Sequence, residues 1–133
     1  MIETALTLPL VLLVAVGIFE FGRAYETSQV LTNAAREGAR VAVLPSPAEG
    51  AADARVRSYL QLGGLTYDQT VGVALTQVQV SLGAAGNASA TQVTVTYPFT
   101  FMVLQPVAQL VVSGSTLGTA FNMSASATMR NEQ

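Results

Sequence analysis

Few residues in this chain are able to do chemistry, because it contains no histidine and no cysteine. Their absence excludes imidazole and thiolate metal sites, disulfides, cysteine nucleophiles and histidine general bases. Paired carboxylates remain, and Glu49 and Asp53 stand one helical turn apart. That spacing is also ordinary at a helix N-terminus, where acids favour the positive end of the helix dipole. With no glycine-rich phosphate motif either, the sequence predicts a protein that is not an enzyme and uses no cofactor.

Glu3 is the most unusual charged residue, since the next charge along the chain is Glu20. A carboxylate at the edge of a membrane-length apolar helix is costly unless a cation neutralises it. One interpretation gives Glu3 a partner amine, at its own N-terminus or at that of a neighbouring copy. The other places Glu3 among lipid headgroups, where it favours the positive helix end.

Two further sets of charged residues follow Glu3 in the sequence. Glu20 and Arg23 have the i, i+3 spacing of an ion pair, which contributes only about 0.2–0.5 kcal/mol when exposed. Arg36 and Arg40 stand one turn apart, where they could dock a carboxylate from another subunit or from the rest of the chain. For both sets the alternative is a solvated helix face with no function.

Charge is scarce along the whole chain, which is 11% charged and 50% apolar. An average soluble domain has roughly 25% charged residues. The six basic residues are all arginines and are scattered, so the sequence predicts no nucleic-acid partner. This composition favours a packed assembly over a freely dissolved monomer, and the 133 residues give room for one domain with an appendage.

A long helix from Ile2 to about Leu44 is expected to position the charged residues, with a kink at Pro9. Residues 1–22 are apolar nearly all round, as in a segment surrounded by lipid or by other helices. Residues 23–44 are amphipathic and are expected to lie on a globular domain of residues 45–133. Nothing basic precedes the apolar run, so we interpret it as a retained segment from which any leader is already absent, and not as a signal peptide.

The residues expected to make contacts form two groups on this helix. Assembly is expected to use Glu3, Ala5, Leu6, Leu8, Pro9, Leu10, Leu12, Leu13, Val16, Phe19 and Phe21. Contacts with the globular domain are expected from Tyr25, Leu31, Ala35, Arg36 and Arg40. In the domain, Asn87 and Asn122 stand in Asn-X-Ser sequences and are candidate N-glycosylation acceptors, although this short pattern is common by chance.

Residues 45–133 are expected to add a short helix and a small antiparallel sheet, so that the fold class is α+β. Ser46-Pro47-Ala48-Glu49 has the form of a capping box, which predicts a helix to about Leu62, stopped by Gly63-Gly64. Alternation of period two predicts strands around residues 78–82, 93–101 and 121–129. Residues 83–91 are expected to form a turn, and the apolar LQPVAQLVV within 102–120 a short helix.

Sequence motifs at both ends of the chain resemble one family. The stretch IETALTLPLVLLVAVGIFEFGRAY, followed by LTNAAREGARVAV, resembles the TadE-like family of pilin-like proteins from tight-adherence (type IVc) pilus systems. TVTYPFTF and SASATMRNE resemble the strands and the closing motif of the same family, and residues 45–90 are merely compatible with it. Glu3 matches the acid near the mature N-terminus of pilins, although that acid usually stands fifth, which leaves open where the mature chain begins.

The resemblance implies a secreted filament component with self-association as its main partnership. A prepilin peptidase removes a basic leader from such proteins, the inner membrane holds them by the apolar helix, and an assembly machinery inserts them into an extracellular pilus used for adhesion. A repeated structural subunit is the first hypothesis, because the composition leaves apolar surface for self-complementary faces. A minor priming or tip pilin is the second. A rival from another class is a membrane-anchored binding domain that never polymerises.

Overall fold

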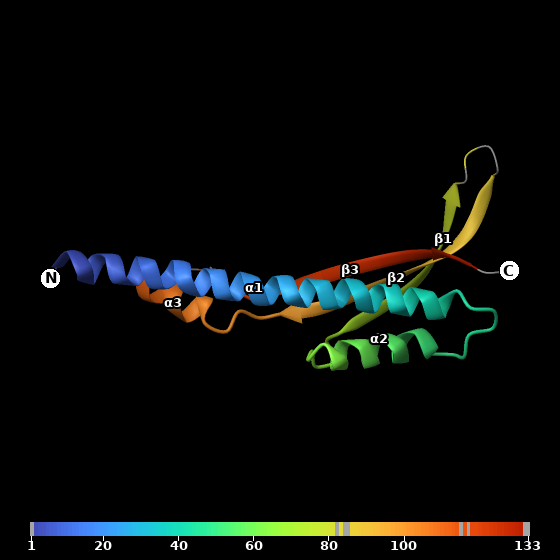
Figure 1. Ribbon diagram of the computed structural model, residues 1–133, viewed down its shortest axis with the longest axis horizontal. Helices are drawn as coiled ribbons and strands as arrows, with labels where there is room; N and C mark the ends of the chain where they lie inside the picture. Colours follow the sequence, from blue (N-terminus) through green and yellow to red (C-terminus); the bar gives the residue numbers. More distant parts are fainter. Residues whose placement is uncertain (1, 82, 84–85, 115, 117, 132–133) are drawn as a thin grey trace. The chain divides into compact units, whose positions relative to one another are not determined.

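The computed structural model of the chain has an α+β fold, with one long N-terminal helix, shorter helices and an antiparallel sheet (Figure 1). The predicted fold class is therefore confirmed. The structure describes residues 2–81, 83, 86–114, 116 and 118–131; the side chains of residues 2, 3, 5, 6, 110 and 111 are not described. The elements in chain order are α1 (Ile2–Ala42), α2 (Ala51–Leu62), β1 (Gly72–Ser81), β2 (Asn87–Phe99), α3 (Leu104–Val111) and β3 (Phe121–Arg130).

The chain divides into two compact units. The N-terminal unit consists of Met1–Glu26 and Pro98–Asn122, and the sheet unit of Thr27–Tyr97 and Met123–Gln133. The first half of α1 belongs to the N-terminal unit together with α3, whereas the second half of α1 belongs to the sheet unit.

The sheet has the strand order β1-β2-β3. β1 pairs antiparallel with β2, from Gly72 opposite Thr96 to Ser81 opposite Asn87. Toward the hairpin end, a polar side chain joins the strands from the end of β3. Thr91 Oγ1 donates a hydrogen bond to Asn131 Oδ1 at 2.7 Å, and Asn131 Nδ2 donates one to Gln77 Oε1 at 3.2 Å.

The core of the sheet unit lies where the second half of α1 and α2 cover one face of the sheet (Figure 1). Its fully or nearly fully buried members come from all three elements: Leu31, Ala34, Ala35, Ala39, Val56, Leu60, Val93 and Val95. Alternation along β2 directs its valines to this face, and alanines at helical spacing on α1 let the backbones approach closely. At Gly38 the approach is tightest, since a Cβ there would lie 2.5 Å from Val56 Cγ2.

Two local predictions were wrong. The capping box does not form, because α2 begins only at Ala51, after Gly50 in a left-handed conformation with φ 75° and without a side-chain cap. Ser46 lies in the preceding turn with φ 55°. Because α2 begins only after Gly50, Ser46 is too far from the first turn of the helix to cap it. The second wrong prediction is the turn over residues 83–91, since β2 already begins at Asn87. The small residues there do not favour a strand by themselves, but they pair with β1 across the hairpin.

Other boundaries agree more closely with expectation. α2 ends at Leu62 before Gly63, as predicted, and the apolar segment after residue 102 does form a helix, α3. α1 ends at Ala42, two residues before the predicted Leu44. β2 ends at Phe99, so Phe101 lies outside the strand that was predicted to contain it. Leu82, expected in the first strand, lies outside the described residues.

The close approach at Gly38 predicts opposite effects for two glycine substitutions in α1. Gly38→Ala should lower the free energy of unfolding by about 1–2 kcal/mol, because overpacking exceeds the gain of about 1 kcal/mol in helix propensity. Gly22→Ala is the matched control, since its added Cβ would meet no described atom within 4 Å beyond its own helix backbone and chain neighbours; it should raise stability slightly. Thermal unfolding of both variants in detergent, followed by circular dichroism, measures the difference. Equal stability of the two variants would contradict this close approach at Gly38.

Candidate functional site

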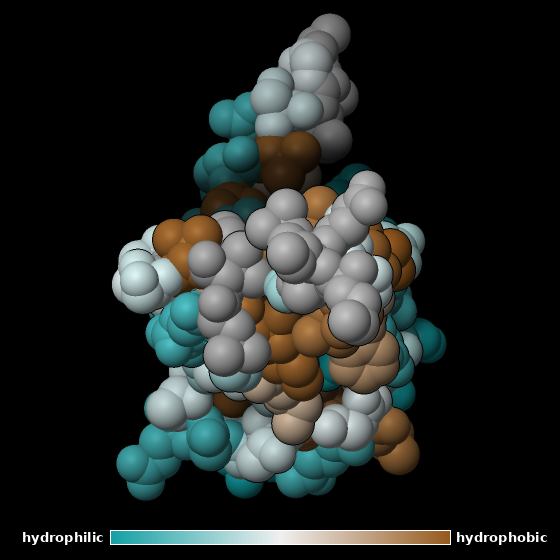
Figure 2. All heavy atoms as spheres, turned by 90° about the vertical axis from the view of Figure 1, so that its left-hand side faces the viewer, coloured by the Kyte–Doolittle hydropathy of each residue, from teal (hydrophilic) through white to brown (hydrophobic). Residues whose placement is uncertain are grey.

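The first half of α1 displays large apolar side chains that the described chain leaves uncovered. Ile18 is 71% exposed, and Leu8, Leu10, Val11, Leu12, Val14, Phe19 and Phe21 are also exposed. Seen from its N-terminal side, the molecule shows hydrophobic residues gathered on its surface (Figure 2). By length and composition alone, α1 from Thr7 onward could cross a membrane, a test that the core helix of a soluble protein also passes. An apolar surface of this extent indicates a contact with lipid or with protein.

One stripe of this helix half is covered. Leu13, Val16 and Gly17 are half-buried and Glu20 is buried, and their spacing of three and four residues puts them on one helix face. α3 lies alongside this half of α1 (Figure 1). It buries Leu104, Val107 and Ala108, which share one face at the same spacing. The two stripes are the faces through which these neighbouring helices pack.

Glu20 is fully buried, and hydrogen bonds engage both of its carboxylate oxygens. Oε1 accepts hydrogen bonds from the backbone N–H groups of Met102 at 2.8 Å and Val103 at 2.7 Å. Oε2 accepts one from Arg23 Nη1 at 2.6 Å. A buried carboxylate is stable only when its charge is paired and its lone pairs are used, and here both conditions hold.

The contact of Glu20 also completes the start of α3. The first N–H groups of a helix have no partner within the helix, and a side-chain oxygen usually accepts from them. Val103 precedes α3 and offers no such oxygen, and α3 has no side-chain cap of its own. Glu20 supplies the acceptor from α1, and its negative charge favours the positive end of the α3 dipole.

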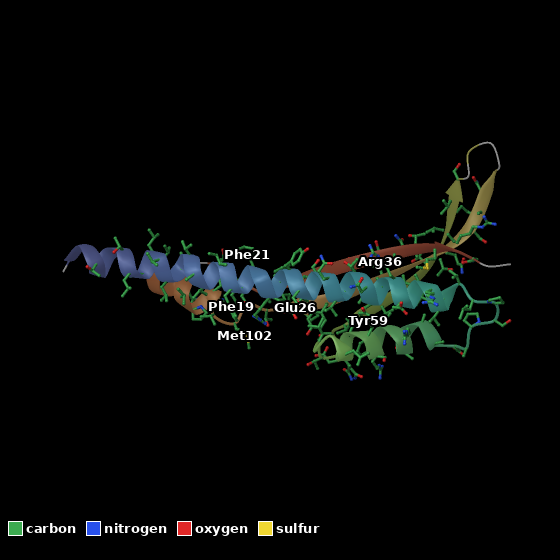
Figure 3. The ribbon with its side chains drawn as sticks, viewed as in Figure 1. Phe19, Phe21, Glu26, Arg36, Tyr59 and Met102 are labelled. Carbon is green, nitrogen blue, oxygen red and sulfur yellow. The ribbon has the colours of Figure 1, made fainter. Side chains whose placement is uncertain are left out.

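Aromatic rings surround this contact. Phe99 and Phe101 lie edge to face with ring centroids 5.2 Å apart, and Phe121 packs 5.7 Å from both. Phe21 of α1 reaches Phe101 at 6.4 Å, and the Arg23 guanidinium lies 5.4 Å above the Phe99 ring. Figure 3 labels Phe19 and Phe21 on α1 and Met102 on the segment that leads into α3. These rings hold the segment before α3 against α1.

Sequence reasoning found only part of this site. The i, i+3 pair of Glu20 with Arg23 is present, but the alternative of a solvated pair is wrong, because Glu20 is buried. The role of Glu20 at the start of α3 was missed, since its backbone partners lie 82 and 83 positions away. The available signal was an acid flanked by Phe19 and Phe21 at the end of an apolar run.

The other predicted site residues are distributed differently. α1 continues through Pro9, and the side chains of Glu3, Ala5 and Leu6 lie outside the described residues. Leu31 and Ala35 lie in the core of the sheet unit, whereas Tyr25, Arg36 and Arg40 are exposed. Asn87 at the start of β2 and Asn122 in β3 are exposed as well. Sequence reasoning did not single out Met102 and Val103, whose N–H groups bind Glu20 just before α3.

Two surface hollows lie in the sheet unit. One, of about 390 Å³, is lined by Glu37, Arg40, Val41, Leu44 and Arg55, and Arg55 Nη2 contacts Glu37 Oε2 at 3.0 Å. The other, of about 320 Å³, is lined by Arg57, Tyr67, Asp68, Gln69 and Val71. Burial and the Asp53 carboxylate raise the pKa of Tyr67, so its hydroxyl acts as a donor and not as a base. Among the described residues, no three potential metal ligands come together.

Comparison with known proteins relates the start of the chain to a family. Residues 1–40 match the model of a family described as TadE-like protein. The match therefore covers α1 almost to its end and includes Glu20 and Arg23. No curated protein and no solved structure matches the chain.

The contacts of Glu20 predict a specific effect on α3. Glu20→Ala should lower the free energy of unfolding by about 1–3 kcal/mol, because it removes the shared acceptor of two backbone N–H donors and the partner of Arg23. Glu20→Gln should cost less, since its amide oxygen still accepts from those donors. Hydrogen exchange measured by mass spectrometry should show lost protection in residues 102–109 of Glu20→Ala. Glu26→Ala, at an exposed acid of the same helix, is the control; identical exchange in both variants would contradict the capping role.

Proposed function

We propose that this chain, a TadE-like protein over its first 40 residues, is a pilin-like subunit of a tight-adherence type of pilus. Lipid of the inner membrane holds it through the first half of α1 before assembly. A prepilin peptidase and the pilus assembly machinery act on it there. The same helix half then packs against copies of itself in an extracellular filament that serves in adhesion.

The observation that carries this proposal is the apolar surface of α1. Side chains from Leu8 to Phe21 are exposed on most of the helix circumference, and α3 covers only the stripe from Leu13 to Glu20. Burial of such surface contributes about 25 cal/mol per Å², and a filament repeats it at every subunit. Lipid before assembly and neighbouring copies after it would both remove the same apolar side chains from water.

Glu3 has a distinct role in this proposal. In lipid or in a filament core, its carboxylate is costly unless a cation lies beside it. We assign that cation to an N-terminal amine, its own or that of a neighbouring copy. Such a buried pair favours one register of neighbouring helices more than it adds net stability.

The repeated structural subunit is the first assignment within this function. From Gln69 to Met129 the sequence has no charged residue, so this part of the chain brings no like-charge repulsion into close packing of copies. The second assignment is a minor subunit that primes or tips the filament. Images of native filaments with a resolved repeat distinguish the two, since only a repeated subunit occupies every position. Finding the chain only as a monomer in membrane fractions would contradict both assignments.

Glu3→Ala should reduce the number of filaments while membrane insertion stays intact, because the apolar segment that follows Glu3 is unchanged. Filament counts by electron microscopy and carbonate extraction of membranes measure the two quantities separately. Thr4→Ala, at an exposed neighbouring position, is the control for changes at the start of α1. A normal filament count in Glu3→Ala would refute the role of this acid.

A further inference from the structure

We infer that α3 enters the lipid bilayer beside α1, so that two helices of the N-terminal unit lie in the membrane before assembly. This inference rests on the membrane stage of the proposed function. It adds a second lipid-facing element, formed by a segment about 80 residues further along the chain.

The position of α3 along α1 is the first reason. The N–H groups of Met102 and Val103 bind Glu20, so α3 begins at the level of Glu20. From there it runs beside α1 back toward the N-terminal end (Figure 1). At about 1.5 Å per residue, the eight residues of α3 extend about 12 Å along its neighbour. Helices that lie side by side share a depth, so if α1 is in lipid up to Phe19, α3 is in lipid too.

The surface chemistry of this segment is the second reason. Residues 98–122, the second segment of the N-terminal unit, contain no charged side chain. α3 buries one apolar face against α1, yet apolar residues also face outward at its two ends, where Met102 is 68% and Val112 60% exposed. α2 is different, since its exposed face carries Arg55 and Arg57. The described outer side of α3 itself shows Pro106 and Gln109, which carry no charge. An uncharged helix flanked by exposed apolar residues fits the outer part of a leaflet better than α2 does.

Contacts of the backbone and of the nearby charges are also compatible with lipid, where polar groups need hydrogen bonds and charges need partners. An N–H group without an acceptor is costly in hydrocarbon, and the Glu20 carboxylate accepts from the N–H groups of Met102 and Val103 just before α3. The charge of Glu20 is paired with Arg23, whose side chain is partly exposed and long enough to reach the headgroups. The phenylalanine rings around Arg23 would lie at the same boundary. The uncharged amides of Gln105 and Gln109 limit the depth, which places α3 in the outer part of one leaflet.

Tryptophan fluorescence tests this placement cleanly, because the chain contains no tryptophan of its own. Single-tryptophan variants of the full chain are reconstituted into phosphatidylcholine vesicles whose acyl chains carry bromine, a quencher that acts by contact. Val112→Trp and Met102→Trp report on α3. Ile18→Trp on the exposed face of α1 is the lipid reference, and Leu62→Trp, at an 83% exposed position that ends α2, is the aqueous control.

We expect Val112→Trp to lose fluorescence to a degree that approaches Ile18→Trp, while Leu62→Trp keeps the fluorescence that it has in unbrominated vesicles. Bromine in the middle of the chains should quench Val112→Trp more than Met102→Trp, because α3 runs inward from Glu20. Circular dichroism of each variant checks that the fold is retained at these exposed positions. The order of quenching thus reports both the presence and the direction of α3 in lipid.

Three results would overturn the inference. If Ile18→Trp is quenched and Val112→Trp is not, α1 is in lipid without α3, and the membrane stage of the proposed function stands. If neither is quenched, that membrane stage fails as well. If Val112→Trp is shielded from aqueous iodide but insensitive to brominated chains, a second copy of the chain covers α3 instead of lipid.

Discussion

The arrangement of the N-terminal unit depends on one buried carboxylate. Glu20 joins α1 to the start of α3 through two backbone donors, and Arg23 balances its charge. Breaking a buried pair of this kind is costly, whereas forming it contributes little net stability, so its main effect is to select one arrangement. The position of α3, the packing of the phenylalanine rings before it and the covered stripe on α1 all follow from that selection.

Local patterns carried most of what the sequence could reveal. Apolar periodicity predicted α1 almost to its end, Gly63 marked the end of α2, and alternation found the strands, because each of these signals acts over a few residues. The start of α2 was missed because a turn with Ser46 at positive φ replaces the capping box. The start of β2 was missed because pairing with β1, which the sequence of β2 does not contain, makes a strand of small residues.

The site was harder to predict than the fold. Spacing reveals a partner three residues away, such as Arg23, but not a pair of backbone donors more than 80 residues away. Backbone donors also leave no signature in the sequence, since every residue except proline has one. The burial of Glu20 could have been suspected only from its apolar neighbours. Long-range capping of this kind has to be seen in the structure.

Glu3 and Glu20 therefore differ in how they respond to a change of surroundings. Lipid and other helices are similarly favourable surroundings for the apolar side chains on α1. These side chains therefore do not by themselves favour a filament over the membrane. The partners of Glu20 all belong to the same unit, so the transfer that the proposed function requires would leave them unchanged. Under the proposed function an N-terminal amine neutralises Glu3, and an amine from a neighbouring copy becomes available only in the filament. The acid that fixes the subunit and the acid that recognises the assembly are then separate residues.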